Sequence, residues 1–253
     1  MDTTPASPSP APESSPALSL GARALAIFAR PTQAWGGLER RGQWWFPLLI
    51  TVVVTVIGSV ATYQRAAVPT NLAMMEQRVE AGSLDAAHYE AMEQWVSSPL
   101  AMWIQGVSVL IGLPLVTLAF ALIPWIGVGF MMGQRFRFRD AFVVTAWTGL
   151  VALPNQILTF VLAWVSESMM NIHTGFGVLL PSEETPSRLM TGLGAFLDQG
   201  IGPFSIWYVA VMALGAAALS GAPRRRVLMT IGGLWLVVTA LLAVMAGFFG
   251  RGA

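Results

Sequence analysis

Three side-chain amides, Gln105, Asn155 and Gln156, are the groups best placed for binding chemistry, because each lies within a long apolar run. Asn155 and Gln156 directly follow Pro154, and a proline leaves one helical carbonyl without its usual hydrogen-bond donor. Two amides beside such a carbonyl can bind a small polar ligand. Amides in a bilayer also bridge neighbouring helices, at about 1 kcal/mol or less per bond. The sequence favours this bridging role.

Carboxylates are confined to polar segments between the apolar runs, where Glu90 with Glu93 and Glu183 with Glu184 form pairs. Such pairs can bind cations or transfer protons. Glutamates of this kind are usually solvated, and no His is near the second pair in sequence. The chain has no Cys and only two His, and it lacks phosphate-binding Gly loops, HExxH and GxSxG. We therefore predict no enzyme, no cofactor and no metal site.

Composition indicates a membrane protein. Of the 253 residues, 55% are hydrophobic and 11% are charged, whereas a soluble domain carries about 25% charged residues. A soluble globule with so few charges would expose large apolar patches to water. A bilayer removes that difficulty.

The elements that must position the amides are transmembrane helices, each needing about 20 apolar residues. We predict an all-α, polytopic bundle of five such helices, over residues 44–63, 100–133, 142–165, 203–220 and 227–249. The second run contains Pro114 and Pro124 and exceeds one bilayer crossing. Splitting it would leave about 16 residues per span, too few to cross. We favour one tilted, kinked span whose end projects from the membrane, and leave open whether that helix is broken.

The N-terminal part divides into a Pro/Ser/Ala-rich tail at 1–18, predicted to be disordered and cytoplasmic, and a membrane domain at 19–253. The tail lacks the apolar stretch of a signal peptide. Residues 19–43 interleave apolar residues with arginines, and Pro31 interrupts them. Two interpretations stay open for this short interfacial segment: helices lying on the bilayer surface, or a collar packed against the bundle.

The distribution of arginines predicts which way round the chain lies in the membrane. Ten lie in the N-terminal part or in the connectors that follow the second and fourth spans, and four lie elsewhere. Because positive residues concentrate in cytoplasmic loops, we predict a cytoplasmic N-terminus and an outer C-terminus, in a bacterial inner (plasma) membrane. Anionic lipid headgroups suffice to explain the basic connectors, so no nucleic-acid partner is expected. The connector arginines are Arg135, Arg137, Arg139, Arg224, Arg225 and Arg226.

Small side chains recur at four-residue spacing on some spans, so that they share one helix face. Thr51 and Thr55 form such a face on the first span, beside Gly58, and Ala213 and Ala217 form one on the fourth. Small residues let helix backbones approach closely. We expect these faces, with a similar face on the fifth span, to contact other membrane proteins.

Three stretches of the sequence carry a family resemblance: Phe28-Ala-Arg-Pro31-Thr-Gln-Ala-Trp35 with Trp44-Trp45-Phe-Pro47, then Ala152-Leu-Pro154, then Pro203-Phe204-Ser205-Ile-Trp207. With them the chain resembles the Yip1 family of integral membrane proteins in its bacterial form, over roughly residues 25–249. The resemblance implies a five-span bundle with a cytoplasmic N-terminus. Eukaryotic relatives act in vesicle trafficking and bind Rab-type GTPases, but this chain lacks their tyrosine-glycine-proline type motif, so no functional residue is carried over.

Two functions remain. The leading one is a non-enzymatic scaffold or trafficking-type partner protein that contacts membrane lipids and other membrane proteins, in homo- or hetero-oligomers. The alternative is a small-molecule permease or channel component. A polar cavity where Gln105, Asn155 and Gln156 meet would favour the permease, and dry, tightly packed spans would favour the scaffold.

Overall fold

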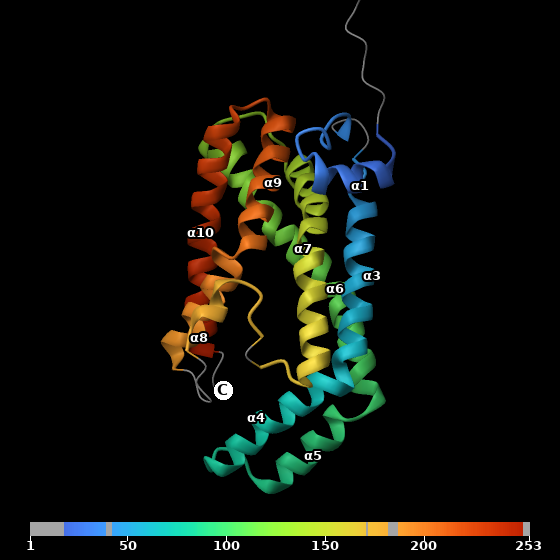
Figure 1. Ribbon diagram of the computed structural model, residues 1–253, viewed down its shortest axis with the longest axis vertical. Coiled ribbons are helices and arrows are strands. Elements are labelled where there is room, and N and C mark those ends of the chain that lie inside the picture. Colours follow the sequence, from blue (N-terminus) through green and yellow to red (C-terminus); the bar gives the residue numbers. More distant parts are fainter. Residues whose placement is uncertain (1–17, 39–41, 171, 182–186, 250–253) are drawn as a thin grey trace, which may run out of the picture.

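The computed structural model of the chain is an elongated bundle of helices (Figure 1). It describes residues 18–38, 42–170, 172–181 and 187–249, so the tail predicted over 1–18 lies almost wholly outside it. Across these ranges there is no strand, and five helices are long and apolar enough to cross a membrane. The prediction of an all-α, five-span membrane protein is confirmed.

The first spanning segment is longer than its apolar part. Helix α3 (Trp45–Thr62) continues through a π-helical turn, η1 (Tyr63–Ala67), into the polar helix α4 (Val68–Glu80). Because the helix does not stop at the end of the apolar run, α4 projects beyond the bundle and pairs with α5 (Figure 1). The remaining elements are α1 (Leu20–Ala29), α5 (Ala86–Val96), α6 (Pro99–Pro124), η2 (Trp125–Met131), α7 (Phe138–Ser166), η3 (Phe176–Leu179), α8 (Arg188–Ala195), η4 (Phe196–Gly200), α9 (Pro203–Ser220) and α10 (Arg224–Phe249).

The long second apolar run forms one continuous helical segment, in which α6 is extended by the π-helical turn η2. Pro114 lies inside α6 without ending it, and the wider π-helical turn begins directly after Pro124. The segment crosses obliquely behind α7 (Figure 1). Its far end reaches α10, where Gly127 faces Thr230 and Leu234. The run is therefore a single unbroken span.

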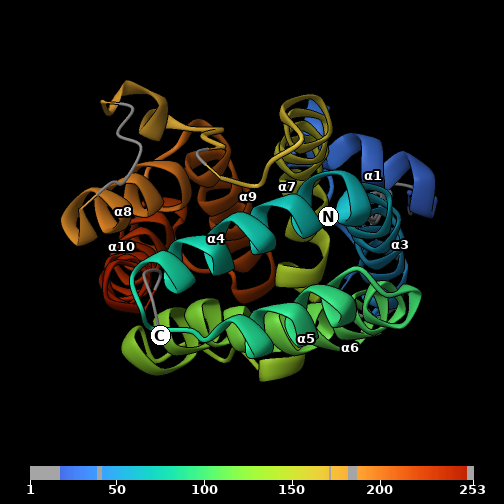
Figure 2. The ribbon, with the colours of Figure 1, turned by 90° about the horizontal axis from the view of Figure 1, so that it is seen from below.

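Helix α7 occupies the centre of the bundle, between α9 on one side and α3 on the other (Figure 2). It also packs against α6 and α1. Its buried half is mostly small or β-branched, which lets its neighbours approach closely. The buried residues of this half are Ala141, Val143, Val144, Thr145, Ala146, Trp147, Thr148, Leu150 and Val151.

The small-residue faces are used inside the bundle. Thr51 and Thr55 are buried on α3, which packs on α7, and a Cβ at Gly58 would overlap the ring of Phe160 on α7. Ala213 and Ala217 of α9 are buried as well. These two faces hold the protein's own helices together, so the expectation that the faces of the first and fourth spans contact other proteins is wrong.

The N-terminal segment is a collar packed against the bundle, one of the two interpretations left open by the sequence. Arg23 is fully buried in this collar, residues 19–38. Its Nη1 donates to the carbonyl of Ala34 at 2.6 Å, and its guanidinium lies 5.7 Å from the ring centroid of Trp147 on α7. The apolar residues that the collar buries are Ile27, Ala34, Trp35 and Leu38.

Gly215 of α9 provides a test of the collar, because a Cβ there would stand 2.7 Å from two ring atoms of Trp35. We expect Gly215→Val to displace the indole and lower the free energy of unfolding by about 1–3 kcal/mol, as overpacking does. Gly233→Val is the matched control, since a Cβ at Gly233 meets nothing within 4 Å. Thermal unfolding in detergent, followed by circular dichroism, measures both variants. Equal melting temperatures would contradict the packing described.

Candidate functional site

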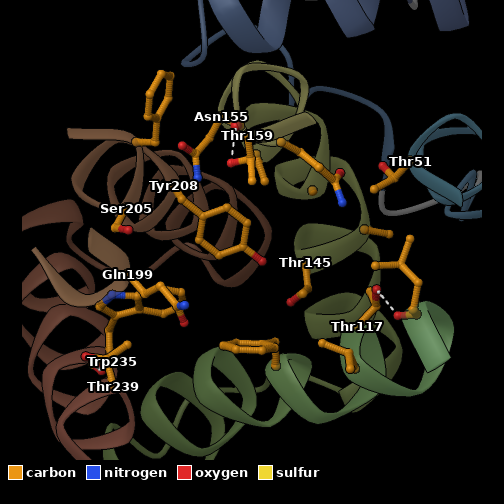
Figure 3. Close-up of a pocket in the computed structure, with 18 of the residues that line it drawn as sticks. Thr51, Thr117, Thr145, Asn155, Thr159, Gln199, Ser205, Tyr208, Trp235 and Thr239 are labelled. Carbon is orange, nitrogen blue, oxygen red and sulfur yellow. Dashed lines mark hydrogen bonds between the residues drawn. The ribbon is translucent and has the colours of Figure 1, made fainter. Parts of the chain in front are cut away.

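A cavity of about 450 Å³ lies within the bundle, bordered by α3, α6, α7, α9, α10 and η4 (Figure 3). Its volume is within the range of about 300–1,000 Å³ typical of small-molecule sites. Apolar side chains make up the rest of the wall, and no charged side chain is among the described residues that line it. The hydrogen-bonding residues of the wall are Thr51, Thr117, Thr145, Asn155, Gln156, Thr159, Gln199, Ser205, Tyr208, Trp235 and Thr239.

The threonines of the cavity offer oxygen lone pairs and not protons. Each donates its hydroxyl to the carbonyl four residues earlier in its own helix, at 2.8 to 2.9 Å. Helices in hydrocarbon must satisfy their polar groups internally, which favours this local bond. Since a hydroxyl has one proton and two lone pairs, these threonines can accept a further hydrogen bond but have no proton left to donate. The five residues are Thr51, Thr117, Thr145, Thr159 and Thr239.

The neighbouring amides Asn155 and Gln156 differ in what they do. Gln156 is hydrogen-bonded to α3, with its Oε1 3.0 Å from Oγ1 of Thr55. This is the bridging role favoured by the sequence. Asn155 Oδ1 is buried and accepts no hydrogen bond from the described residues. Asn155 is therefore the amide that has bonding capacity left for a ligand.

Gln105 does not join the other two amides. It is exposed on α6 and is not part of the cavity wall, so the structure does not bring Gln105 together with Asn155 and Gln156. Pro154 is also exposed and outside the wall. The oblique course of α6 and the rotation of each helix decide which side chains face inward, and neither can be derived from spacing along one helix.

The last third of the chain supplies cavity residues that the sequence analysis missed, among them Gln199, Ser205 and Tyr208. Figure 3 shows the Tyr208 ring reaching into the cavity from α9. The ring packs 5.3 Å from that of Trp235, whose Nε1 donates to Gly200 at 3.1 Å. One signal was present: Tyr prefers membrane interfaces, so a tyrosine within a span is unusual.

A second cavity, of about 610 Å³, lies beside the first and shares Gln199 with it. Its wall holds His173, whose Nδ1 is 2.7 Å from Oδ2 of Asp198. The other oxygen of Asp198 accepts the backbone N–H groups of Gly175 and Gly177, at 2.9 and 3.0 Å. Through these bonds Asp198 anchors the loop that carries His173, Gly175 and Gly177.

Of the two glutamate pairs, the structure describes one. Glu90 and Glu93 are exposed on α5, and Glu183 and Glu184 lie outside the described residues. Among the residues that are described, no group of three or more His, Asp or Glu is placed to hold a metal ion.

The connector arginines are all exposed. The α9–α10 turn, which carries three of them, lies at the same end of the bundle as α1 (Figure 1). The guanidinium of Arg139 lies against Gly42, which follows the collar, so closely that a Cβ at Gly42 would overlap it. These residues are Arg135, Arg137, Arg139, Arg224, Arg225 and Arg226.

Comparison with protein families matches the Yip1 domain over residues 25–245. The chain belongs to the Yip1 domain family. The matched range includes every residue of the cavity wall, so the cavity of this Yip1-domain protein belongs to its family domain and not to an added segment. No curated protein and no solved structure matches the chain.

We expect substitutions of the two amides to have different effects on thermal stability. Asn155→Leu removes a buried acceptor without a partner and should leave the melting temperature unchanged or higher, because no bond is lost. Gln156→Leu removes the bond to Thr55 and should destabilise the protein by about 0.6 kcal/mol, the average for such bonds in membranes. Thermal unfolding in detergent compares them. A larger loss for Asn155→Leu would show that its amide is already bonded.

Proposed function

We propose that this Yip1-domain protein is a non-enzymatic membrane protein that binds a small uncharged molecule inside its bundle. The observation that carries the proposal is the Oδ1 atom of Asn155, a buried acceptor without a partner at a cavity wall. Leaving such a group unbonded costs about 1–3 kcal/mol. A ligand that donates a hydrogen bond to Asn155 removes that cost.

The chemistry of the wall defines the ligand class. The threonine oxygens and Asn155 accept hydrogen bonds, so the ligand needs donors. The many apolar side chains of the wall call for an apolar body. An ion is disfavoured because burying a charge without a counter-charge is costly. The ligand is thus an uncharged amphipathic molecule with hydroxyl or amide donors.

A permease for such a molecule is one form of this function. The wall has no Asp, Glu, His, Arg or Lys among its described residues. Proton- or ion-driven carriers usually use such groups within the membrane. We therefore propose equilibrative movement or storage of the ligand, without coupling to a gradient.

A scaffold remains the second candidate, because the α4–α5 hairpin projects beyond the bundle (Figure 1). Met74, Met92 and Trp95 are exposed on it, by 41%, 39% and 49%. This hairpin is the surface we propose for partner proteins, since the small-residue faces of α3 and α9 are buried. Identification of the proteins and small molecules that co-purify under native conditions separates the candidates: a specific protein supports the scaffold, and a stoichiometric small molecule supports the cavity.

Filling the cavity tests the ligand proposal. Ala152 lines the cavity, whereas Ala119 is exposed on α6, so Ala152→Phe and Ala119→Phe add the same ring inside and outside. Uncharged donor-bearing amphiphiles should raise the melting temperature of the wild type and of Ala119→Phe, and should not affect Ala152→Phe. Charged analogues should have no effect. Equal shifts in all three proteins would refute binding at this site, and solute flux in liposomes would identify a permease.

We also propose that the N-terminus is cytoplasmic and the C-terminus lies outside, in the plasma membrane of a bacterium. The ten-to-four arginine asymmetry of the sequence supports this orientation. A reporter active only outside the cell, fused after residue 253, should be active, and the same reporter fused before residue 1 should be silent. The reverse pattern would overturn the orientation.

A further inference from the structure

An apolar groove of about 380 Å³ runs along the outer surface of the bundle between α3 and α7. Among the described residues that line it, Thr62 carries the one hydroxyl, which donates to the carbonyl of Gly58 at 2.8 Å within α3. Its rims are open, since Ile57 and Val161 are 63% and 52% exposed. The groove is lined by Val54, Ile57, Gly58, Ala61, Thr62, Ile157, Phe160, Val161 and Trp164.

One small exposed residue of α3, Ala61, forms the open floor of the groove. One turn earlier the ring of Phe160, which also borders the central cavity, covers Gly58. A hydrocarbon chain can therefore lie against α3 at Ala61 and against the Phe160 ring beside it. The groove extends from the middle of α3 to the end of α7, as an acyl chain in one leaflet does.

The end of the groove carries opposite charges. Trp164 closes it, and the guanidinium of Arg65 lies 4.9 Å from the ring centroid of Trp164. Arg65 Nη2 is 2.8 Å from Oε1 of Glu167, with side chains 46% and 62% exposed. Glu167 caps α7 in a left-handed conformation, φ 54°, the one positive φ of a non-glycine residue in the described chain. Such a conformation is uncommon outside glycine.

We propose that this groove binds a phospholipid whose zwitterionic headgroup carries a primary ammonium, of the phosphatidylethanolamine class. The acyl chain fills the groove, the phosphate accepts from the free N–H groups of Arg65, and the ammonium donates to Glu167. Arg65 has five donors, of which the bond to Glu167 occupies one. Trp164 lies where aromatic rings favour the membrane interface.

Charge and hydrogen-bonding capacity together select this headgroup over two common ones. A choline headgroup has the same charges, but its quaternary nitrogen has no N–H to donate to Glu167. A glycerol headgroup is anionic and offers Arg65 a phosphate, but it has no cation for Glu167. Both lose one charge-assisted bond, which corresponds to an affinity about tenfold lower. The inference does not depend on the ligand of the central cavity.

The test uses the full-length protein in detergent micelles titrated with phosphatidylethanolamine, phosphatidylcholine or phosphatidylglycerol of identical acyl chains. Native mass spectrometry measures the lipid-bound fraction. We expect retention of the ethanolamine lipid at about tenfold lower concentration than the other two. Equal retention of ethanolamine and choline lipids, or preference for the glycerol lipid, would overturn the proposal.

Variants locate the site. Glu167→Gln should remove the preference for ethanolamine over choline, and Arg65→Gln should weaken both, whereas Arg78→Gln, an exposed arginine of α4, should change neither. Ala61→Phe should fill the groove and reduce retention of all three lipids, with Ala119→Phe as control. Circular dichroism verifies that each variant is folded. An unchanged preference in Glu167→Gln, unchanged retention in Ala61→Phe, or a second copy of the chain occupying the groove in place of lipid would refute the proposal.

Discussion

The cost of an unpaired hydrogen-bonding group in hydrocarbon is the constraint on which the rest of this structure depends. This cost favours helices, which satisfy their own backbone groups. Within the helices the threonine hydroxyls donate to carbonyls one turn earlier, as Thr145 donates to Ala141 at 2.9 Å. The same cost joins helices where a local partner is lacking, as between Gln156 and Thr55. The Oδ1 atom of Asn155 is a buried acceptor without a partner among the described residues, and on it rests the proposal of a ligand in the central cavity.

Close packing around α7 satisfies the same constraint through shape. Thr, Ala and Gly on α3 and α9 let these helices approach α7, and Trp35 of the collar fits against Gly215 where a Cβ would clash. The buried charge of Arg23 is tolerated because a carbonyl and the face of Trp147 surround it. The helices that meet at α7 also enclose the cavity, so the bundle that holds the protein together builds its candidate site.

The sequence predicted features that depend on one segment alone, such as the length of a span. It did not predict features that depend on how two helices pack against each other. The single long second span followed from its length, because two spans of about 16 residues cannot cross a bilayer. The collar could not be distinguished from a surface helix, since both place apolar residues among arginines. Gln105 and Gln156 look alike in sequence, yet one is exposed and the other bridges α7 to α3.

The sequence by itself determined the number of spans, the family, the segregation of arginines and the lack of charged groups within the spans, because these depend on composition along one dimension. Only the tertiary structure decided which face of each helix turns inward, and so the cavity, Tyr208 in its wall, and the pairing of Arg65 with Glu167. The reason is physical: in a bilayer both the lipid-facing and the protein-facing sides of a helix are apolar. Hydrophobic periodicity then carries little information about rotation, and packing against neighbours sets it.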